Sequence, residues 1–366
     1  MNKQLQNIFF QLLRLGLWGQ GRLNVDHRLS AEDWQQLYTA AVKRTVEGLI
    51  YDSFNFLQED QLPPPSLRMK WAIRIDQIER INMKMNTVIA TQYQFFSDIG
   101  LSPILQKGQG VAQCYRSPLH RVSGDIDWYF ESGGYIEARK SLKKKHISIE
   151  DTAGFSLNYR YQNIDIEHHK KLFDIRNPFK TGYLKNLQER YADQYQYLKV
   201  EDQSVRILSP ELQLLQVNVH ILKHLIALGI GLRQFCDSAR LYHTLSSQID
   251  PDALKKIYRD LGILQWTHAL HRILVDLIGL PITDVPFPYP KDIEINWIVD
   301  EIWYAGNFGY QDERFEGGKT SSLSMHPDGA NRLWTNFRRY YKYAPMEVFF
   351  YPLEQLYSKL IGIDRD

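Results

Sequence analysis

Lys107-Gly-Gln-Gly-Val-Ala112 and Arg121-Val-Ser-Gly-Asp-Ile-Asp-Trp128 are the two most informative segments of this 366-residue sequence. The second segment has the aromatic and branched composition of a β-strand, and in a strand Asp125 and Asp127 point to the same face. Two carboxylates held this close repel each other unless a cation neutralises them, and Mg²⁺ prefers such oxygen ligands. The pattern predicts either a platform for a divalent metal or an ordinary solvated pair of acids at a strand edge.

A third acid is expected on a later strand. In Ile164-Asp-Ile-Glu-His-His169, the alternation of side chains places Asp165, Glu167 and His169 on one face. If this strand lies beside the Asp-x-Asp strand, three carboxylates converge. Such a cluster can hold two divalent ions, which stabilise the attacking and leaving oxygens of a displacement at phosphorus.

A glycine-containing turn precedes the acid pair. Gly108 and Gly110 let backbone N–H groups approach a phosphate, and Lys107 adds positive charge. Arg121 and Ser123 stand just before the acids, where they can contact a phosphate or the acceptor. A plain ion pair between Arg121 and one of the acids is the alternative.

The order of these elements resembles the nucleotidyltransferase superfamily of the polymerase-β type, and more closely its bacterial family of uncharacterised nucleotidyltransferases. The motifs of that family match this sequence at Gln106-Lys107-Gly108, Arg121, Asp125-Ile-Asp127 and Glu167-His168-His169. The helical region of the family is similar to Ser209-Pro-Glu211, His220 with His224, and Leu232-Arg-Gln-Phe-Cys-Asp237. The resemblance covers residues 99–245.

The resemblance implies an α+β fold, in which a small mixed-sheet nucleotidyltransferase core is flanked by N-terminal and C-terminal helical regions. Three prolines at 63–65 and four between Pro281 and Pro290 interrupt the chain. We therefore expect an N-terminal helical region over 1–98, the α/β core over 99–206, a helical domain over 207–280, and an aromatic-rich extension over 281–366 that packs on the rest.

Apolar periodicity predicts the elements within this division. We expect a long helix between the three prolines and Gly100, strands near 103–106 and 126–130, a hairpin of 155–161 with 163–169, a basic helix over 137–145, and helices over 211–229, 231–247, 251–262 and 264–279. Near 293–303 we expect a strand. Gly317-Gly-Lys-Thr320 is expected to be a mobile surface loop, because Glu313 stands where a phosphate-binding loop needs its first glycine.

By the same resemblance, the protein transfers a nucleoside monophosphate from a nucleoside triphosphate such as ATP to an acceptor, and pyrophosphate leaves. The implied cofactor is Mg²⁺, or Mn²⁺ in its place. Asp125 and Asp127 hold the ions, and Glu167, with Asp165 as the alternative, completes the site and accepts the proton of the acceptor. The nucleotide-binding candidates are Lys107, Gly108, Gln109, Arg121, Ser123, Gly124 and Lys223, and His169 and His220 are further candidates for the site.

Four polar residues of the predicted helices have ordinary structural interpretations. His220 and His224 are one helical turn apart and can bind a metal, but no acid lies within that turn, so packed and hydrogen-bonded histidines are the alternative. Arg233 and Asp237 have the spacing of an intrahelical ion pair.

Two other functions remain open. Gln109 stands where the superfamily has a small residue, which favours a catalytically degenerate protein that binds a nucleotide or a partner protein without chemistry. A toxin-like enzyme that modifies tRNA or protein hydroxyls is the third hypothesis. The sequence leaves the acceptor open among a small molecule, a protein and tRNA.

The composition excludes several classes of protein. The 44 Lys and Arg against 42 Asp and Glu leave a net charge of +2, which argues against binding nucleic acid or anionic membranes through bulk charge. Two cysteines cannot build a disulfide framework. Charged residues interrupt every apolar run before the roughly 20 residues that span a bilayer. We expect a cytoplasmic globular protein with no membrane partner.

Overall fold

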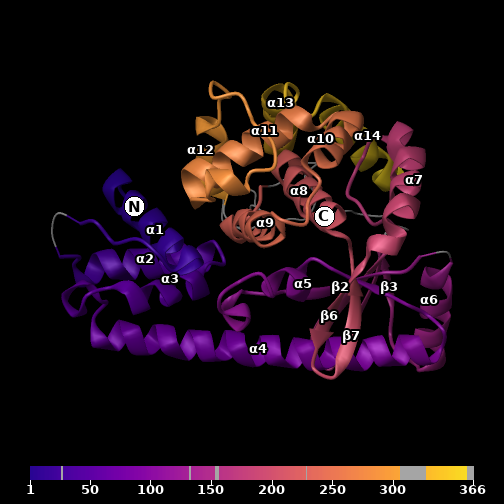
Figure 1. Ribbon diagram of the computed structural model, residues 1–366, viewed down its shortest axis with the longest axis horizontal. Helices are drawn as coiled ribbons and strands as arrows, with labels where there is room; N and C mark the ends of the chain where they lie inside the picture. The colour runs from indigo at the N-terminus through magenta and orange to yellow at the C-terminus, as the bar shows by residue number, and fades with distance from the viewer. Residues whose placement is uncertain (26–27, 132, 153–155, 228, 306–326, 361–366) are drawn as a thin grey trace.

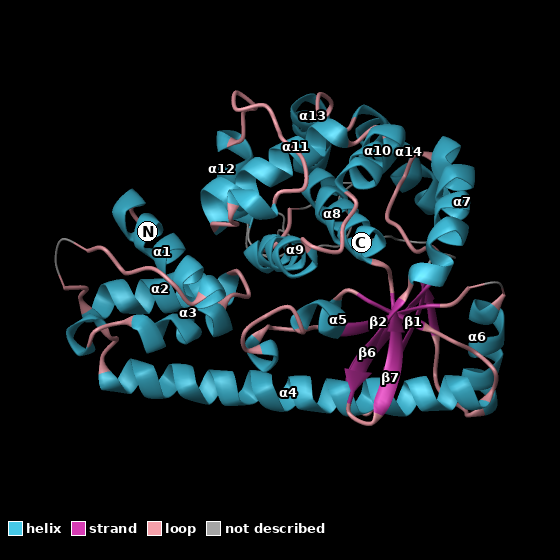
Figure 2. Ribbon diagram, viewed as in Figure 1, coloured by secondary structure: helices cyan, strands magenta, loops and turns pink. Residues whose placement is uncertain are grey.

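The computed structural model describes residues 1–25, 28–131, 133–152, 156–227, 229–305 and 327–360. Figure 1 shows one long helix, α4 (Pro65–Asp98), along one side of the molecule. The N-terminal helices stand on one end of α4 and the strands on the other, while the C-terminal helices lie across from it. Figure 2 shows the same arrangement by type of secondary structure.

Helices precede the first strand, as predicted. They are α1 (Lys3–Trp18), α2 (Ala31–Lys43), α3 (Glu47–Ser53), the 3-10 turns η1 (Phe54–Phe56) and η2 (Glu59–Gln61), and α4. Pro65 is the first residue of α4. A proline is accepted there because its missing N–H would have no intrahelical partner in any case.

Helix α4 contributes to two hydrophobic cores. Its first half buries Leu67, Trp71, Ile75 and Ile78 in the larger core, which includes the N-terminal and C-terminal helices. Its second half buries apolar side chains in the core of the sheet: Met85, Val88, Ile89, Tyr93 and Phe96. Between the two sets, the buried Asn82 donates hydrogen bonds to the carbonyls of Leu119 and Arg121 at 2.6 and 2.8 Å.

A mixed five-stranded sheet forms the α/β part of the fold. Its strands are β1 (Ile104–Gln106), β2 (Asp125–Tyr129), β3 (Glu150–Thr152), β4 (Ser156–Tyr161) and β5 (Ile164–His169), in the order β1-β2-β5-β4-β3. Strands β2 and β5 are parallel, and the other neighbours are antiparallel. The predicted hairpin is β4–β5, and the α+β fold class is confirmed.

Short helices and a second hairpin complete this region. The helices are α5 (Gly108–Ala112), α6 (Gly134–Lys144) and α7 (Thr181–Tyr191), with 3-10 turns η3 (Pro118–His120), η4 (Pro178–Lys180) and η5 (Ala192–Gln194). The hairpin of β6 (Gln196–Val200) and β7 (Gln203–Ile207) was not predicted. It adds Val200 and Val205 to the core of the sheet.

The helices predicted after the sheet are present. They are α8 (Pro210–Ala227), α9 (Leu232–Leu245), α10 (Pro251–Leu261) and α11 (Leu264–Ile273), which continues as a π-helical turn, η6 (Leu274–Ile278). The short turn η7 (Ile282–Asp284) and the helices α12 (Asn296–Ala305), α13 (Pro327–Tyr340) and α14 (Pro345–Leu360) follow.

The strand expected near 293–303 is wrong, because most of that segment belongs to α12. Ile295, Ile298 and Ile302 are buried at intervals of three and four residues, which is the period of a helix face. The aromatic and branched composition of the segment suits packing against α13 rather than a sheet: Trp297 contacts Tyr340 at a centroid distance of 4.9 Å.

Two further features expected from the sequence are membrane-spanning segments, expected to be absent, and the glycine loop. None of the described helices is long and apolar enough to cross a membrane. The glycine loop at 317–320 lies outside the described residues.

Candidate functional site

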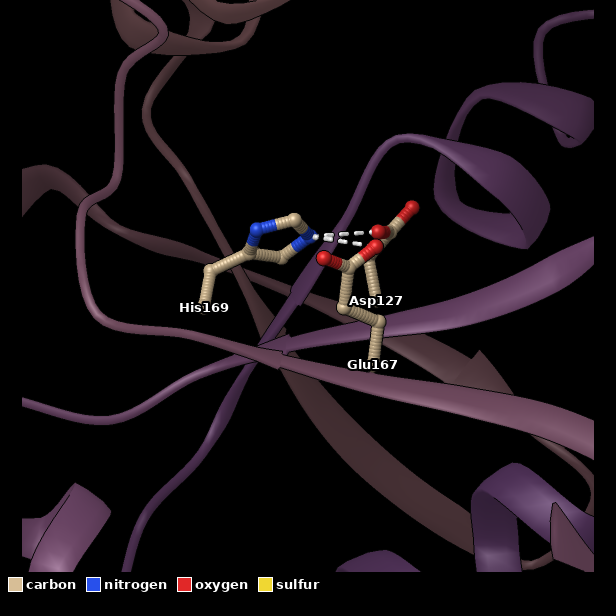
Figure 3. Close-up of side chains that lie close together, drawn as sticks. All are labelled: Asp127, Glu167 and His169. Atoms are coloured by element: carbon tan, nitrogen blue, oxygen red, sulfur yellow. Dashed lines mark hydrogen bonds and ion pairs between the residues drawn. The ribbon is translucent and has the colours of Figure 1, made fainter. Parts of the chain in front are cut away.

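Asp127, Glu167 and His169 converge on one face of the sheet. The parallel register of β2 and β5 sets Asp127 directly opposite Glu167, and His169 follows Glu167 two residues later on the same face. His169 Nε2 lies 2.6 Å from Asp127 Oδ1 and 3.6 Å from Glu167 Oε2. One oxygen or nitrogen from each residue lies within 4.8 Å of the others (Figure 3). This spacing fits three ligands of one metal ion.

The other two predicted acids lie at the beginning of the same strands. Asp125 pairs with Asp165 in the register, and neither belongs to the group of three converging side chains. Asp165 is exposed and forms an ion pair with Arg160 at 3.2 Å. Of the two predicted third carboxylates, the structure therefore brings Glu167 to Asp127 and leaves Asp165 beside Arg160.

Charges inside the site are strongly coupled. Lys107 Nζ lies 3.6 Å from Asp127 Oδ1. Burial alone would raise the pKa of Asp127, but Lys107 and His169 outweigh it and hold this pKa below its usual range. Asp125 is exposed, and the negative charge of Asp127 beside it is the main cause that raises the pKa of Asp125 to about 6. Although burial opposes its charge, the carboxylates around Lys107 raise the pKa of the ammonium, with Asp127 the strongest contributor. Lys107 is thus a positively charged side chain within the acid cluster, next to Asp127.

The turn between β1 and α5 has an unusual backbone. Lys107 has φ +43° and ψ −138°, and Gly108 has φ +40°. Positive φ costs a residue with a side chain energy, and such strain occurs at functional sites. Gln109 does not crowd this turn, because its side chain is buried and donates to Asn82 Oδ1 at 2.9 Å. The side chain of Gln109 is therefore directed into the core beside α4 and not into the turn.

Arg121 precedes Asp125 and Asp127 in the sequence, but its ion pair is with another residue. Its guanidinium pairs with Asp237 of α9 through two contacts of 2.7 Å, and Nη1 donates to Ser123 Oγ at 3.0 Å. Tyr115 donates to the same carboxylate at 2.6 Å. The predicted intrahelical pair of Arg233 with Asp237 is wrong, since Asp237 faces Arg121 and Arg233 donates to the carbonyl of Val122. This network fixes the loop that leads into Asp125.

A second charged cluster joins the segment that follows β5 to α8. Asp174 accepts from Lys223 Nζ at 2.9 Å and lies 3.0 Å from His220 Nδ1. Burial raises the pKa of Asp174, but Lys223 and His220 more than reverse this effect and leave it well below its usual range. Burial and the charge of Lys107 lower the pKa of His220 to about 4, so this imidazole is neutral near pH 7. The charge of Lys107 acts on both Asp174 and His220, which shows that this cluster adjoins the acid cluster.

Sequence reasoning missed Asp174. It follows the apolar pair Leu172-Phe173 in an irregular segment, with no periodicity that assigns it to a face. The only available signal was the absence of an acidic partner near His220 and Lys223 on their own helix. His220 is hydrogen-bonded and packs against His224 at a centroid distance of 4.4 Å. These contacts are those of a packed, hydrogen-bonded histidine, the alternative to a metal ligand.

The chain belongs to the family described as uncharacterised nucleotidyltransferase, since the sequence model of that family matches residues 30–279. The family expected from the motifs is confirmed, and the match extends into the helices on both sides of the sheet. Among solved structures, the chain is similar to an antigenic nucleotidyltransferase-like protein from Paracoccidioides brasiliensis. The identity is 14% and the TM-score 0.32, over 43% of this chain and 75% of that chain. No curated protein matches the chain.

Proposed function

We propose that this protein transfers a nucleoside monophosphate from a nucleoside triphosphate to an acceptor, with pyrophosphate as the leaving group. The observation that carries the proposal is the convergence of Asp127 and Glu167 across the parallel strands β2 and β5, with Asp125 on the same face. Membership of a nucleotidyltransferase family supports the reaction class. The preferred base and the acceptor, whether a small molecule, a protein or tRNA, are left to experiment.

The carboxylates fit a divalent cation. Asp125, Asp127 and Glu167 bring three carboxyl groups together around the single ammonium of Lys107, and a divalent cation would offset their mutual repulsion. Asp127 and Glu167 would hold Mg²⁺ or Mn²⁺, with Asp125 beside them. The bound cation supplies neutralisation of charge on the reacting phosphate oxygens. Catalysis of this kind depends mainly on positioning and electrostatic stabilisation.

The chain itself supplies the phosphate contacts of the proposal. Lys107 reaches Asp127 from the glycine turn and is placed to contact a phosphate bound beside the acids. Gly108 and Gln109 are the first two residues of α5, and the side chain of Gln109 is engaged in the core, so their backbone N–H groups are the proposed phosphate donors of this turn. Ser123 and Gly124 contribute from the loop that Arg121 holds. Lys223 is paired with Asp174, so in this proposal it acts on phosphate as half of an ion pair rather than as a free cation.

Glu167 is the proposed proton acceptor for the nucleophile. It is half-buried next to Asp127, whereas Asp127 itself is buried and engaged by Lys107 and His169. A carboxylate that keeps contact with solvent can take the proton from an acceptor group and release it. A base placed in this way contributes about 10²–10⁴-fold to a rate.

The test is a labelling reaction. Purified protein is incubated with Mg²⁺ and, in turn, each α-³²P-labelled triphosphate, with cell extract as the source of acceptor. The Asp125→Ala/Asp127→Ala double variant runs in parallel. Label that appears only with the wild type supports nucleotidyl transfer, and the mobility of the product identifies the acceptor class. Absence of label with all triphosphates, together with calorimetric binding of a triphosphate, supports the non-catalytic nucleotide-binding alternative instead.

A further inference from the structure

We infer that the metal site of Asp127, Glu167 and His169 selects Mn²⁺ over Mg²⁺, because His169 serves as a nitrogen ligand of the bound cation. The inference deepens the proposed function and rests on it for the role of the metal. It assigns to this chain a ligand set of two carboxylates and one imidazole, rather than carboxylates alone.

The geometry places the imidazole among the carboxylates. His169 Nε2 lies 2.6 Å from Asp127 Oδ1 and 3.6 Å from Glu167 Oε2, so the ring stands beside the two carboxylates with this nitrogen facing their oxygens (Figure 3). Asp125, which precedes Asp127 by two residues on the same strand, is outside this group. A cation bound by Asp127 and Glu167 therefore has an imidazole nitrogen within reach as a third ligand.

His169 is held in place by the sheet. Strand β5 is central and pairs with β2 on one side and β4 on the other, which fixes the direction of each side chain. His168 points to the opposite face, where it is fully buried and lies 3.0 Å from the hydroxyl of Tyr159. Within the described residues, Nε2 of His169 contacts only the two carboxylates. A ligand that needs no rearrangement loses little entropy on binding a metal.

Ligand chemistry then favours a transition ion. Mg²⁺ takes oxygen ligands in a strict octahedron at about 2.0–2.1 Å and usually keeps several waters. Imidazole nitrogen binds first-row transition ions, whereas carboxylate and phosphate oxygens suit Mg²⁺ and Mn²⁺ alike. Mn²⁺ accepts both kinds of donor. A site with two carboxylates, one imidazole and an incoming triphosphate matches Mn²⁺ on every ligand, and matches Mg²⁺ on all except the nitrogen.

The experiment measures metal binding without nucleotide. The full chain is freed of metal by chelation and titrated with Mn²⁺, and the electron paramagnetic resonance signal of free Mn²⁺ reports binding. Mg²⁺ is then added as a competitor. Pulsed resonance of the bound Mn²⁺ detects coupling to a ligand nitrogen, and a second sample with ¹⁵N-labelled histidine identifies that nitrogen as imidazole without any substitution.

Two variants complete the design. His169→Gln keeps a polar group of similar reach next to Asp127 and removes the imidazole. His243→Gln alters a histidine that also pairs with an aspartate, Asp284, on the surface of α9, and serves as the matched control. We expect the wild type and His243→Gln to bind Mn²⁺ at least about tenfold more tightly than Mg²⁺. We expect His169→Gln to lose about 10–100-fold in Mn²⁺ affinity and to keep its Mg²⁺ affinity.

The outcomes separate this inference from the proposed function. Histidine nitrogen coupling and Mn²⁺ selectivity support the inference, even if no triphosphate yields a labelled product, in which case only the proposed function fails. Bound Mn²⁺ without histidine coupling overturns the inference. Equal affinity for Mg²⁺ and Mn²⁺ also overturns it, and transfer of label under those conditions leaves the proposed function standing.

Discussion

Arg121 and Asp237 form a buried bidentate ion pair in which both nitrogen–oxygen distances are 2.7 Å. Burial opposes both charges, yet the partners offset it, and the pKa of Asp237 stays below its usual range. The same carboxylate accepts from Tyr115, and the same guanidinium reaches Ser123. One ion pair thus connects α9 to the loop in front of the metal site.

Removal of one partner of this pair is expected to destabilise the protein severely. Asp237→Ala leaves Arg121 charged, buried and unpaired, which costs about 3–5 kcal/mol in the free energy of unfolding. Tyr115→Phe removes one hydrogen bond to a charged group and should cost about 1.5–3 kcal/mol. Urea unfolding at pH 7 measures both. A smaller loss for Asp237→Ala than for Tyr115→Phe would contradict the assigned pairing.

Asp127→Asn is expected to abolish turnover without unfolding the protein. The substitution removes the carboxylate that Glu167, His169 and Lys107 surround, and a loss of several kcal/mol in transition-state stabilisation corresponds to about 10³-fold in rate. The labelling reaction measures the rate, and circular dichroism with thermal unfolding checks the fold. Asp76→Asn, which alters an exposed carboxylate of α4, is the control and should label at the wild-type rate. Wild-type turnover by Asp127→Asn would contradict the assignment of Asp127 as a metal ligand.

The third carboxylate can be identified by a paired substitution. Glu167→Gln should reduce the rate about 10²-fold or more, since Glu167 faces Asp127 and is the proposed base. Asp165→Asn should retain more than about half of the rate, because Asp165 pairs with Arg160 at the exposed end of β5. Initial rates of label transfer decide between them. The reverse order of the two effects would assign the role to Asp165.

Acid is expected to destabilise the protein, in part through His271. Burial lowers the pKa of this imidazole to about 3, against about 6.5 in an unfolded chain. Between these values the unfolded state binds the additional proton, so the free energy of unfolding falls as the pH falls, by about 1.4 kcal/mol per pH unit. His271→Phe should reduce the slope by that amount between pH 4 and 6, as measured by urea unfolding at a series of pH values.

His271→Phe suits this test because the site would accept an aromatic ring. His271 is fully buried and contacts the ring of Phe287 at a centroid distance of 4.8 Å. Its Nε2 lies 2.9 Å from the hydroxyl of Tyr242, which also accepts from Asn218, so one hydrogen bond of that hydroxyl survives. An unchanged slope in the variant would show that His271 is already protonated or exposed in the folded protein.

Local pattern was sufficient to predict most of the elements. The period of two in 164–169 predicted β5 and the face on which Glu167 and His169 lie, and the period of helices predicted α8 to α11. The same logic was wrong for α12, where branched and aromatic residues are common to strands and to buried helices. It also missed the hairpin β6–β7, whose residues are half-exposed or exposed except for Val200 and Val205.

Contacts distant in sequence could not be predicted in this way. Arg121 and Asp237 are 116 residues apart, and Asp174 is 46 residues from His220. Neither partner choice leaves a periodic signal, because each depends on how α8 and α9 pack against the sheet. The i,i+4 spacing instead predicted an ion pair of Asp237 with Arg233. Two residues at this spacing on a helix can pair, but they need not do so when a different partner is available.

The passage of α4 from one hydrophobic core into the other has a mechanical consequence. Helix α4 is one continuous helix that packs against the N-terminal helices through Trp71 and against the sheet through Phe96. Midway between these residues, Asn82 is hydrogen-bonded to the loop that contains Arg121. Any movement of the N-terminal helices toward or away from the acids must bend α4 or break the hydrogen bond of Asn82. If substrate binding required such a movement, the binding energy of the substrate would have to pay for the strain in α4. If the helices already stand where the substrate needs them, no binding energy is lost to strain.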